Sequence, residues 1–380
     1  MDGVSAIILA AGESRRMGRF KPLLHLGATT VVERVVQLYA AAGLKDIIVV
    51  TGCNSDALCT ALTHLPLRCI HNGQWRAGMY TSLQAGLGAL PVDARAFFVH
   101  PVDIPLVRPS TVGALARSFH DQRGAVCHPC YDGRRGHPVL IPAALGADLL
   151  AWPGEGGLRA FWQSWTGPWR EVAVADEGIL LDLDTPADLR MLTQRLERDD
   201  RPSADACRVL MTRVEQVPPA VWRHCRAVAA VAGAIADALQ AAGVDLDADL
   251  VRSAALVHDI ARQAPHHAAA GARLLADLGY PRPAAMVAVH MDPPVADAAT
   301  PDEAAVLFLA DKLVVGDRPA DLHTRFERKM AKYGNDPRIA KAIASRRQAA
   351  EALLATVERC IGRPVAALTA DLPLKGEQPG

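Results

Sequence analysis

Glycines and basic side chains meet in one loop near the start of the sequence. Gly12 and Gly18 flank Arg16, and Lys21 follows. Glycine permits backbone conformations that larger side chains resist. The main-chain N–H groups of this loop can therefore wrap a triphosphate, while Arg16 and Lys21 supply positive charge. An ordinary surface charge is the alternative for Arg16. Many glycine-rich basic loops are only turns, so the prediction depends on acidic residues elsewhere.

Carboxylates follow two apolar segments in the same half of the chain. Asp103 comes after the apolar run 96–100, and Asp182 and Asp184 come after a second short apolar stretch. Carboxylates at strand ends suit a Mg²⁺ ion that keeps several waters and bridges substrate phosphates. The alternative for Asp103 is a cap of a turn or helix. Asp182 and Asp184 could likewise begin a helix, because DTPADL has Pro at the position typical of a helix N-terminus.

Histidine and aspartate recur through the second half, where a metal could bring them together. The candidates are His224, His258, Asp259, His267, His290 and Asp311. Neutral imidazole and carboxylate are the ligands expected for a divalent metal that hydrolyses a phosphoester. The adjacent His258 and Asp259 can point at one site only from a helix end or a distorted turn. One histidine on an Ala-rich helix is usually structural, but this set lies in an otherwise apolar region.

The elements that position the first group alternate between strand and helix. Apolar runs at 4–9, 46–51 and 96–100 predict buried strands, and the periodicity of 30–42 and 80–90 predicts helices. Such alternation predicts an α/β domain with a mostly parallel sheet covered on both faces. Ligands then bind at the carboxyl ends of the strands, where Lys21 and Asp103 would face each other.

The second half is Ala-rich and reads as entirely helical. The predicted helices are 222–242, 249–261, 266–278, 283–290, 303–315 and 337–360. A charged stretch that contains proline separates the halves. We therefore expect one domain at 1–195, a linker at 196–205, a helical domain at 206–370 and a flexible tail at 371–380.

Composition excludes several classes of function. The 380 residues contain 41 Lys plus Arg and 41 Asp plus Glu, so no global charge attracts nucleic acid or an anionic membrane. Apolar runs are too short or too broken by charge to span a membrane, and no basic leader precedes the first one. Cys127 and Cys130 form a lone CxxC without the second pair that a zinc site needs. These features predict a reduced, cytoplasmic protein.

Five segments in order resemble the MobA-like nucleotidyltransferase superfamily, and most closely its molybdenum cofactor cytidylyltransferase branch. They read LAAGESRRMGRFK, NGQWRAGM, PVDIPLV, DGRRGHPV and DLDTPADL. The resemblance covers residues 1–195 and implies a Rossmann-like fold that transfers a nucleotide with Mg²⁺.

The resemblance also implies roles for single residues. The nucleotide would contact Leu9, Ala10, Ala11, Gly12, Gly18, Lys21 and Ser82. Arg16, Lys21 and Asp103 would be catalytic, and Asp103 would hold Mg²⁺ with help from Asp184 or Asp182. Gly136, His137 and Pro138 would line the acceptor pocket, although His137 could instead be a structural hydrogen-bonding residue.

Two departures from the branch concern the substrate. The Gln of the usual Gly-Asp-Gln-Pro is absent from PVDIP at 101–105, and GEGGLR at 154–159 replaces the usual Gly-Asp-x-Gly-Ala-Arg. The LAAG form of the loop favours CTP over GTP, with a phosphate-bearing acceptor such as molybdopterin. The alternatives are a GTP or sugar-phosphate nucleotidyltransferase, and a maturation factor that passes a bound cofactor to a molybdenum-containing enzyme with little turnover.

The second half, over residues 205–365, resembles the HD superfamily of metal-dependent phosphohydrolases. The resemblance assigns His224, His258, Asp259 and Asp311 to one metal, and His267 and His290 to a second metal or to the phosphate. His266 competes with His267, but the spacing to Gly271 favours His267. The metal could be Fe, Mn or Mg. A helical domain that has lost catalysis and serves regulation or dimerisation is the alternative.

Overall fold

The computed structural model describes residues 1–122, 124–292, 300–370 and 372. The chain divides into two compact units, Met1–Asp199 and Asp200–Gly380. The expected linker at 196–205 runs from the end of helix α7 (Pro186–Leu196) to the start of α8 (Ala204–Val209). The expected limits of the two domains stay a prediction. Of the tail expected at 371–380, all residues except 372 lie outside the described residues.

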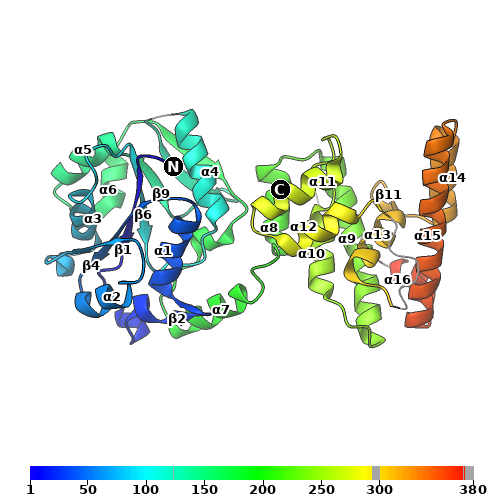
Figure 1. The fold of residues 1–380 in the computed structure, drawn as a ribbon, viewed down its shortest axis with the longest axis horizontal. Coiled ribbons are helices and arrows are strands. Elements are labelled where there is room, and N and C mark those ends of the chain that lie inside the picture. The colour runs from blue at the N-terminus through cyan, green and yellow to red at the C-terminus, as the bar shows by residue number, and fades with distance from the viewer. Residues whose placement is uncertain (123, 293–299, 371, 373–380) are drawn as a thin grey trace. The chain divides into compact units, whose positions relative to one another are not determined.

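An eight-stranded sheet forms the centre of the first unit (Figure 1). Its strands are β1 (Val4–Leu9), β4 (Asp46–Thr51), β5 (Arg68–His71), β6 (Ala96–Pro101), β7 (Val126–Tyr131), β8 (Arg134–Arg135), β9 (Val139–Pro142) and β10 (Trp169–Ala173). The order is β10-β7-β9-β6-β1-β4-β5, and β8 pairs with β7. Strand β1 is parallel to both neighbours, while β9 runs antiparallel to β6 and β7. The α/β class and the mostly parallel sheet are confirmed.

Helices cover both faces of this sheet. Besides α7 they are α1 (Val31–Ala41), α2 (Ser55–Ala61), α3 (Met79–Leu87), α4 (Pro109–Asp121), α5 (Gly146–Ala151) and α6 (Gly157–Ser164). Figure 1 shows α3, α5 and α6 on one side of the strands and α1 and α4 on the other. Residues of β1 alternate between the faces, as they must in a strand. Ile7 packs in the cluster with Leu83 of α3 and Phe161 of α6.

Local sequence explains where the elements that carry the site begin and end. Thr30 and Glu33 form a reciprocal capping box that starts α1. The same arrangement, between Thr185 and Asp188, starts α7 directly after Asp184. Strand β6 ends at Pro101, so Asp103 leaves the sheet at its carboxyl edge.

The second unit is helical. Its helices are α8, α9 (Pro219–Ala241), α10 (Ala248–Val257), α11 (His267–Asp277), α12 (Pro281–Val289), α13 (Glu303–Lys312), α14 (Leu322–Tyr333), α15 (Pro337–Ile361) and α16 (Val365–Thr369). A two-stranded hairpin, β11 (Val314–Val315) with β12 (Arg318–Pro319), interrupts them. Val228, Leu239, Ala254 and Leu307 lie in its buried core.

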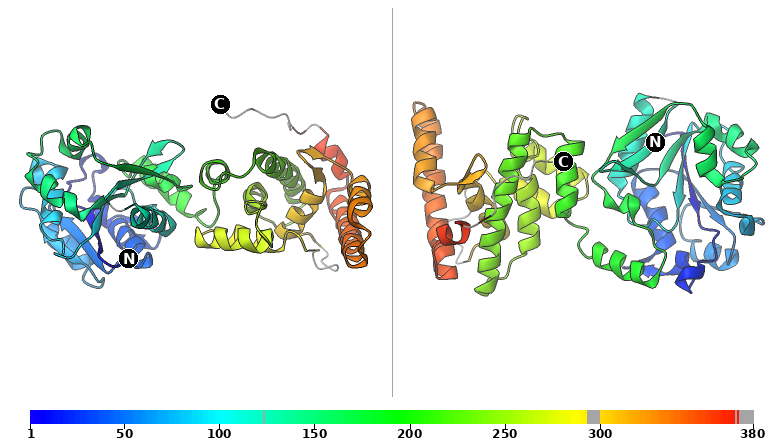
Figure 2. Two further views of the ribbon diagram at one scale, coloured as in Figure 1. Left: turned by 90° about the horizontal axis from the view of Figure 1, so that it is seen from above. Right: turned by 180° about the vertical axis from the view of Figure 1, so that it is seen from behind.

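Helix α14 is an addition to the sequence-based prediction, which left residues 316–336 without an element. It lies beside α15 in each view of Figures 1 and 2. Leu322 and Phe326 attach it to the core, while its exposed surface carries basic residues together with Met330 and Tyr333. This helix matters for the second site.

Candidate active sites

The loop after β1 turns back over the end of that strand. Ser14 and Gly18 both have left-handed backbone conformations, with φ of 59° and 68°, and the Ser14 Oγ accepts a hydrogen bond from the Lys21 main-chain N–H at 3.0 Å. Gly18 therefore has the conformational role that the sequence predicted. For Gly12 the predicted need for a special backbone conformation was wrong. Its φ is not positive, and a Cβ atom there would meet nothing within 4 Å.

The Lys21 side chain joins the loop to acids from two distant segments. Its Nζ lies 2.6 Å from Oδ1 of Asp184 and 3.7 Å from Oδ2 of Asp103. The other oxygen of Asp184 accepts a hydrogen bond from Nη1 of Arg16 at 2.9 Å. The main-chain N–H of Leu183 donates to the Asp103 carbonyl at 2.7 Å, which holds the two acidic segments together. The expected convergence of Lys21 and Asp103 is present.

The three carboxylates are not electrostatically equivalent. Burial raises the pKa of Asp103, although the nearby Lys21 ammonium opposes this shift. Burial also raises the pKa of Asp182, and the negative charges of Asp103 and Asp184 add to the effect. The hydrogen bond from Lys21 lowers the pKa of Asp184. A divalent cation would reduce the repulsion between these carboxylates, and carboxylate oxygens are ligands that suit Mg²⁺.

A cleft of about 590 Å³ opens beside this cluster. Of the residues expected at the nucleotide, all except Gly18 line the cleft: Leu9, Ala10, Ala11, Gly12, Lys21 and Ser82. Asp103 also lines it, whereas Arg16, Asp182 and Asp184 do not. Arg15, Trp75 and Arg76 line it too, and the sequence analysis did not assign them. Trp75 lies within the NGQWRAGM segment, which could have identified it.

A second cavity, of about 890 Å³, continues from the first, since Leu9, Gly78, Met79 and Pro101 line both. Gly136 and His137 line it as expected, but Pro138 does not. A Cβ atom on Gly136 would lie 2.4 Å from the carbonyl oxygen of Ile179, so glycine is required there for close packing.

Aromatic and basic side chains that the sequence analysis missed dominate this second cavity. Trp162, Trp169, His128, Arg135 and Arg159 line it. The rings of Trp162 and Trp169 are 4.9 Å apart, and His128 stands 5.0 Å from Trp169. Three tryptophans lie close together in the sequence at 162–169, and this clustering could have predicted the aromatic cavity.

Buried ring nitrogens in the same cavity lack partners within the described chain. They are Nε2 of His128 and Nδ1 of His137. Burial lowers the pKa of His128 to about 4 and also lowers that of His137, so both rings are neutral at pH 7. A buried polar atom without a partner is costly, and a polar ligand in the cavity would satisfy both.

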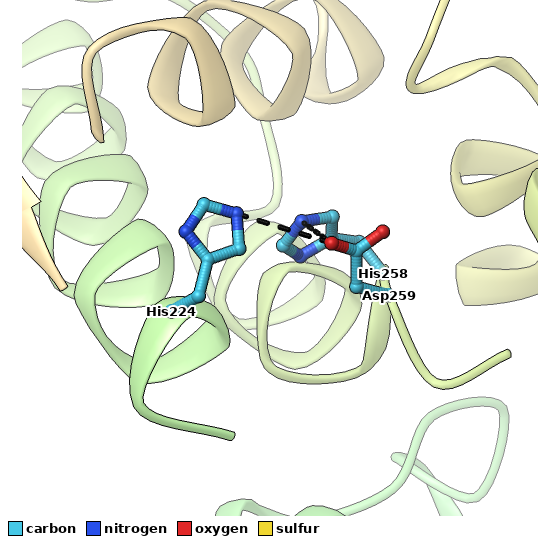
Figure 3. A group of neighbouring side chains, drawn as sticks. All are labelled: His224, His258 and Asp259. Atoms are coloured by element: carbon cyan, nitrogen blue, oxygen red, sulfur yellow. Dashed lines mark ion pairs between the residues drawn. The ribbon is translucent and has the colours of Figure 1, made fainter. Parts of the chain in front are cut away.

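In the second unit, His224 of α9 points toward the end of α10, where His258 is the C-cap and Asp259 follows (Figure 3). The predicted helix-end position of His258 and Asp259 is confirmed. His224 Nε2 lies 3.2 Å from Oδ1 of Asp311 and 4.0 Å from Oδ2 of Asp259. His258 Nε2 lies 3.7 Å from the same Asp259 oxygen.

Asp259 faces a second pair of histidines with its other oxygen. Its Oδ1 lies 3.4 Å from Nε2 of His267 and 3.7 Å from Nε2 of His290. The donor atoms thus form two groups that share Asp259, and in each group they lie within 4.8 Å of one another. His266, the rejected competitor, is exposed at the N-cap of α11.

The imidazoles are oriented as metal ligands usually are. Nδ1 of His224, His258 and His290 contacts the carbonyl oxygen of Gly316, Ala255 and Val287, respectively, at 2.7–2.8 Å. A donated Nδ1–H leaves the Nε2 lone pair free for a metal. Nε2 of both His258 and His290 is buried and has no hydrogen-bond partner among the described residues. These residues fit a divalent metal, because one would satisfy both orphaned atoms.

Electrostatics in this cluster favour ionised acids and, except at His224, neutral histidines. The hydrogen bond and charge of Asp311 raise the pKa of His224, although burial opposes this shift. Burial lowers the pKa of His258 and His267 and lowers that of His290 to about 4. The pKa of Asp311 lies well below its usual value although burial opposes this, chiefly because Lys312 donates to it at 2.6 Å. Neutral imidazole and ionised carboxylate are the forms that bind a metal.

Family models match segments in both halves of the chain. Residues 6–170 match the model of the MobA-like NTP transferase domain. The nicotine blue oxidoreductase of Paenarthrobacter nicotinovorans is 31% identical over 191 residues, which are 48% of this chain and 92% of that protein. The chain belongs to the MobA-like NTP transferase family. Residues 221–316 of the chain match the HD domain model.

Two further proteins are similar to about half of this chain. The molybdenum cofactor cytidylyltransferase of Escherichia coli is 26% identical over 196 residues, covering 51% of this chain and 98% of that protein. The crystal structure of Rv0371c from Mycobacterium tuberculosis is 27% identical with a TM-score of 0.44, covering 50% of this chain and 97% of that one.

No described helix combines the length and apolar character needed to cross a bilayer. Cys127 and Cys130 lie buried in β7, and neither described metal-type cluster contains a cysteine.

Proposed function

We propose that the first unit transfers a nucleoside monophosphate from an NTP, preferably CTP, to a phosphate-bearing acceptor such as molybdopterin. The observation that carries this proposal is the position of the Lys21 ammonium, within 4 Å of Asp103 and Asp184 at the edge of a cleft. CTP is preferred because the loop begins LAAG and because one relative is named a cytidylyltransferase.

In this reaction the protein would position the substrates and neutralise their negative charge. An oxygen of the acceptor phosphate forms a bond to the α-phosphorus, the bond from that phosphorus to the bridging oxygen breaks, and pyrophosphate leaves. Asp103, with Asp182 or Asp184, would hold Mg²⁺, which when bound neutralises phosphate charge. Lys21 and Arg16 would bind the triphosphate, and the loop around Gly12 would donate main-chain N–H groups.

The aromatic cavity is the proposed acceptor site. Because it continues from the nucleotide cleft, an acceptor there can bring its phosphate to the α-phosphorus. Trp162 and Trp169 offer faces for a planar ring system, and Arg135 and Arg159 offer charge for a phosphate. The nucleotide cofactor so formed would serve a molybdenum-containing enzyme.

Pyrophosphate release tests this proposal. The full-length chain is incubated with Mg²⁺, molybdopterin and each of the four NTPs in turn. Release that requires both the acceptor and CTP supports it, and preference for GTP would reassign the nucleotide. An absence of release with every NTP would favour the maturation factor that binds without turnover.

We further propose that the HD unit is a metal-dependent phosphohydrolase. His224, His258 and Asp311 would hold one metal, His267 and His290 a second, and Asp259 would contact both. When bound, these metals, Fe, Mn or Mg, supply Lewis-acid activation of water and of the phosphoester. Orthophosphate release from p-nitrophenyl phosphate, measured with each metal for the wild type and His258→Ala, tests this. Equal release by both would contradict it.

A second candidate for the first unit is an oxidoreductase. It is favoured by one observation, the 31% identity to a relative named nicotine blue oxidoreductase. Oxidation of a reduced nicotinamide dinucleotide in the presence of a coloured heteroaromatic acceptor would identify this activity. Oxidation that survives Asp103→Asn would favour it over nucleotide transfer.

A further inference from the structure

Helix α14 lines a pocket of about 450 Å³ beside the metal cluster of the HD unit. Arg325, Arg328, Lys329 and Lys332 of this helix all line the pocket. They follow one another at the spacing i, i+3, i+4 and i+7, which places them along one face of a helix. The match to the HD domain ends at residue 316, so this basic face is a feature that the chain adds beyond the family match.

The face is anchored to the metal site. The buried Arg325 guanidinium donates hydrogen bonds to the main-chain carbonyls of Asp311 and Val314. Arg328 and Lys329 come one turn later on the same face. Arg325 therefore fixes α14 at the C-terminal end of α13, next to Asp311.

The basic residues of the pocket have few anionic partners. Five cationic side chains line it, the four of α14 and Arg262, against two acids, Asp259 and Asp311. Asp259 pairs with Arg262 at 3.4 Å and Asp311 pairs with Arg325 at 3.6 Å. Both acids are also engaged by histidines or by Lys312. Within the described chain, Arg328 and Lys329 have no ion pair. Burial, together with the neighbouring cations Arg325 and Lys312, lowers the pKa of Lys329 to about 8. An anion in the pocket would relieve this repulsion.

The length of the face indicates more than one phosphate group. Four positions from i to i+7 extend over about 10 Å of helix axis, a length that linked phosphates can follow. The pocket also has a less polar wall, with Val221, Val315 and the Tyr333 ring. Aromatic and apolar surface beside a row of cations suits a base next to its phosphates.

We propose that the α14 face binds the linked phosphates of a nucleoside di- or triphosphate, whose terminal phosphate lies at the metal cluster. This inference rests on the phosphohydrolase proposal and specifies its substrate class. In the reaction, a water oxygen forms a bond to the terminal phosphorus, the bond from that phosphorus to the bridging oxygen breaks, and orthophosphate and the shorter nucleotide leave. Inorganic pyrophosphate, the product proposed for the first unit, has the same linked phosphates and is the other source.

The test compares substrates and variants of the full-length chain loaded with Mn²⁺. Orthophosphate release is measured from CDP, GDP, pyrophosphate and p-nitrophenyl phosphate. Lys329→Ala should raise KM for the nucleoside diphosphates about tenfold, as expected for loss of a charged hydrogen bond, and leave p-nitrophenyl phosphate hydrolysis unchanged. Lys329→Arg should restore the low KM. Lys341→Ala, an exposed charge on the neighbouring α15, is the matched control and should have no effect.

Binding without turnover gives an independent measurement. Calorimetry with methylenediphosphonate, whose carbon bridge resists hydrolysis, is performed on the metal-free full-length chain. A binding site that the Arg328→Ala/Lys329→Ala double variant loses and Lys21→Ala retains supports the inference.

The outcomes separate the two proposals. If the variants change KM for p-nitrophenyl phosphate and CDP equally, or change neither, the α14 inference is overturned while the hydrolase stands. If the wild type hydrolyses nothing, the hydrolase proposal fails, and retention of the methylenediphosphonate site in the double variant overturns the inference as well. If pyrophosphate is hydrolysed but no nucleotide is, the assignment of a nucleotide substrate is overturned and pyrophosphate is identified as the ligand.

Discussion

The Lys21 ammonium lies 3.7 Å from a carboxylate oxygen of Asp103, although the two residues are 82 positions apart in the chain. The residue pair bridges the carboxyl ends of β1 and β6, which are adjacent parallel strands. Asp103→Asn should lower pyrophosphate release about a hundredfold or more, because the amide is a weaker Mg²⁺ ligand.

The fold should tolerate this substitution. Burial already raises the pKa of Asp103, so a neutral side chain of the same shape removes a charge that is costly to bury. Thermal unfolding of Asp103→Asn should match that of Asp93→Asn, an exposed control. A large loss of stability in Asp103→Asn alone would mean that the lost activity reports unfolding.

Asp184 forms ion pairs with both basic side chains that are expected to bind the triphosphate. Lys21 and Arg16 contact its two oxygens at 2.6 and 2.9 Å. Asp184→Asn should therefore bind CTP several-fold more tightly without Mg²⁺, since the internal anion no longer competes. With Mg²⁺ its kcat should fall, because a metal ligand is lost. Calorimetry and pyrophosphate release measure the two effects, and weaker metal-free binding would contradict the account.

Trp169 forms part of the proposed acceptor wall and does not line the nucleotide cleft. Trp169→Ala should raise KM for the acceptor about tenfold, from the loss of ring stacking and of buried apolar area, and leave KM for CTP unchanged. Steady-state kinetics with each substrate varied in turn would measure this. Equal effects on both KM values would indicate a general disturbance of the sheet.

Asp259 contacts both groups of histidines, so its removal should affect both metals. Asp259→Asn should lose most of the bound metal, whereas His290→Ala should lose only the metal of its own group. Metal analysis after dialysis measures the difference. The account would be contradicted if Asp259→Asn kept the metal content of the wild type.

His100 predicts how the first unit responds to acid. It is fully buried, and its two nitrogens contact Tyr39 Oη and the Ile104 carbonyl at 2.9 Å each. Burial lowers its pKa to about 3. Its contribution to stability is therefore present above the unfolded pKa of about 6.5 and is lost as pH falls toward 3, by up to about 1.4 kcal/mol per pH unit.

Urea unfolding measured between pH 7 and pH 4 tests the role of His100. The His100→Asn variant should show a flatter pH dependence than the wild type, while the exposed control His120→Asn should follow the wild type. If stability depended on pH in the same way in all three proteins, His100 would not be the cause of that dependence.

The sequence predicted three of the eight strands of this sheet, because β1, β4 and β6 are buried on both faces and read as continuous apolar runs. It missed α14 because the helical spacing there belongs to arginine and lysine, while few apolar residues, among them Leu322 and Phe326, pack into the core. The pairing of Asp184 with Lys21 and Arg16, and the sharing of Asp259 between histidine groups, depend on side-chain directions that motif spacing does not specify.

The wall of Trp162 and Trp169 was missed for a different reason. These residues come from α6 and β10, outside the segments that resemble the family. Only the folding of β10 beside β7 brings Trp169 next to His128.

The most direct measurement is a crystal structure of the full-length chain soaked with Mn²⁺ and CTP, with anomalous scattering to locate the metal. We predict an anomalous peak in the first unit in contact with Asp103 and with Asp182 or Asp184, and Lys21 turned from Asp184 to the triphosphate. A peak remote from Asp103, or CTP bound away from the loop of Gly12, would contradict the account.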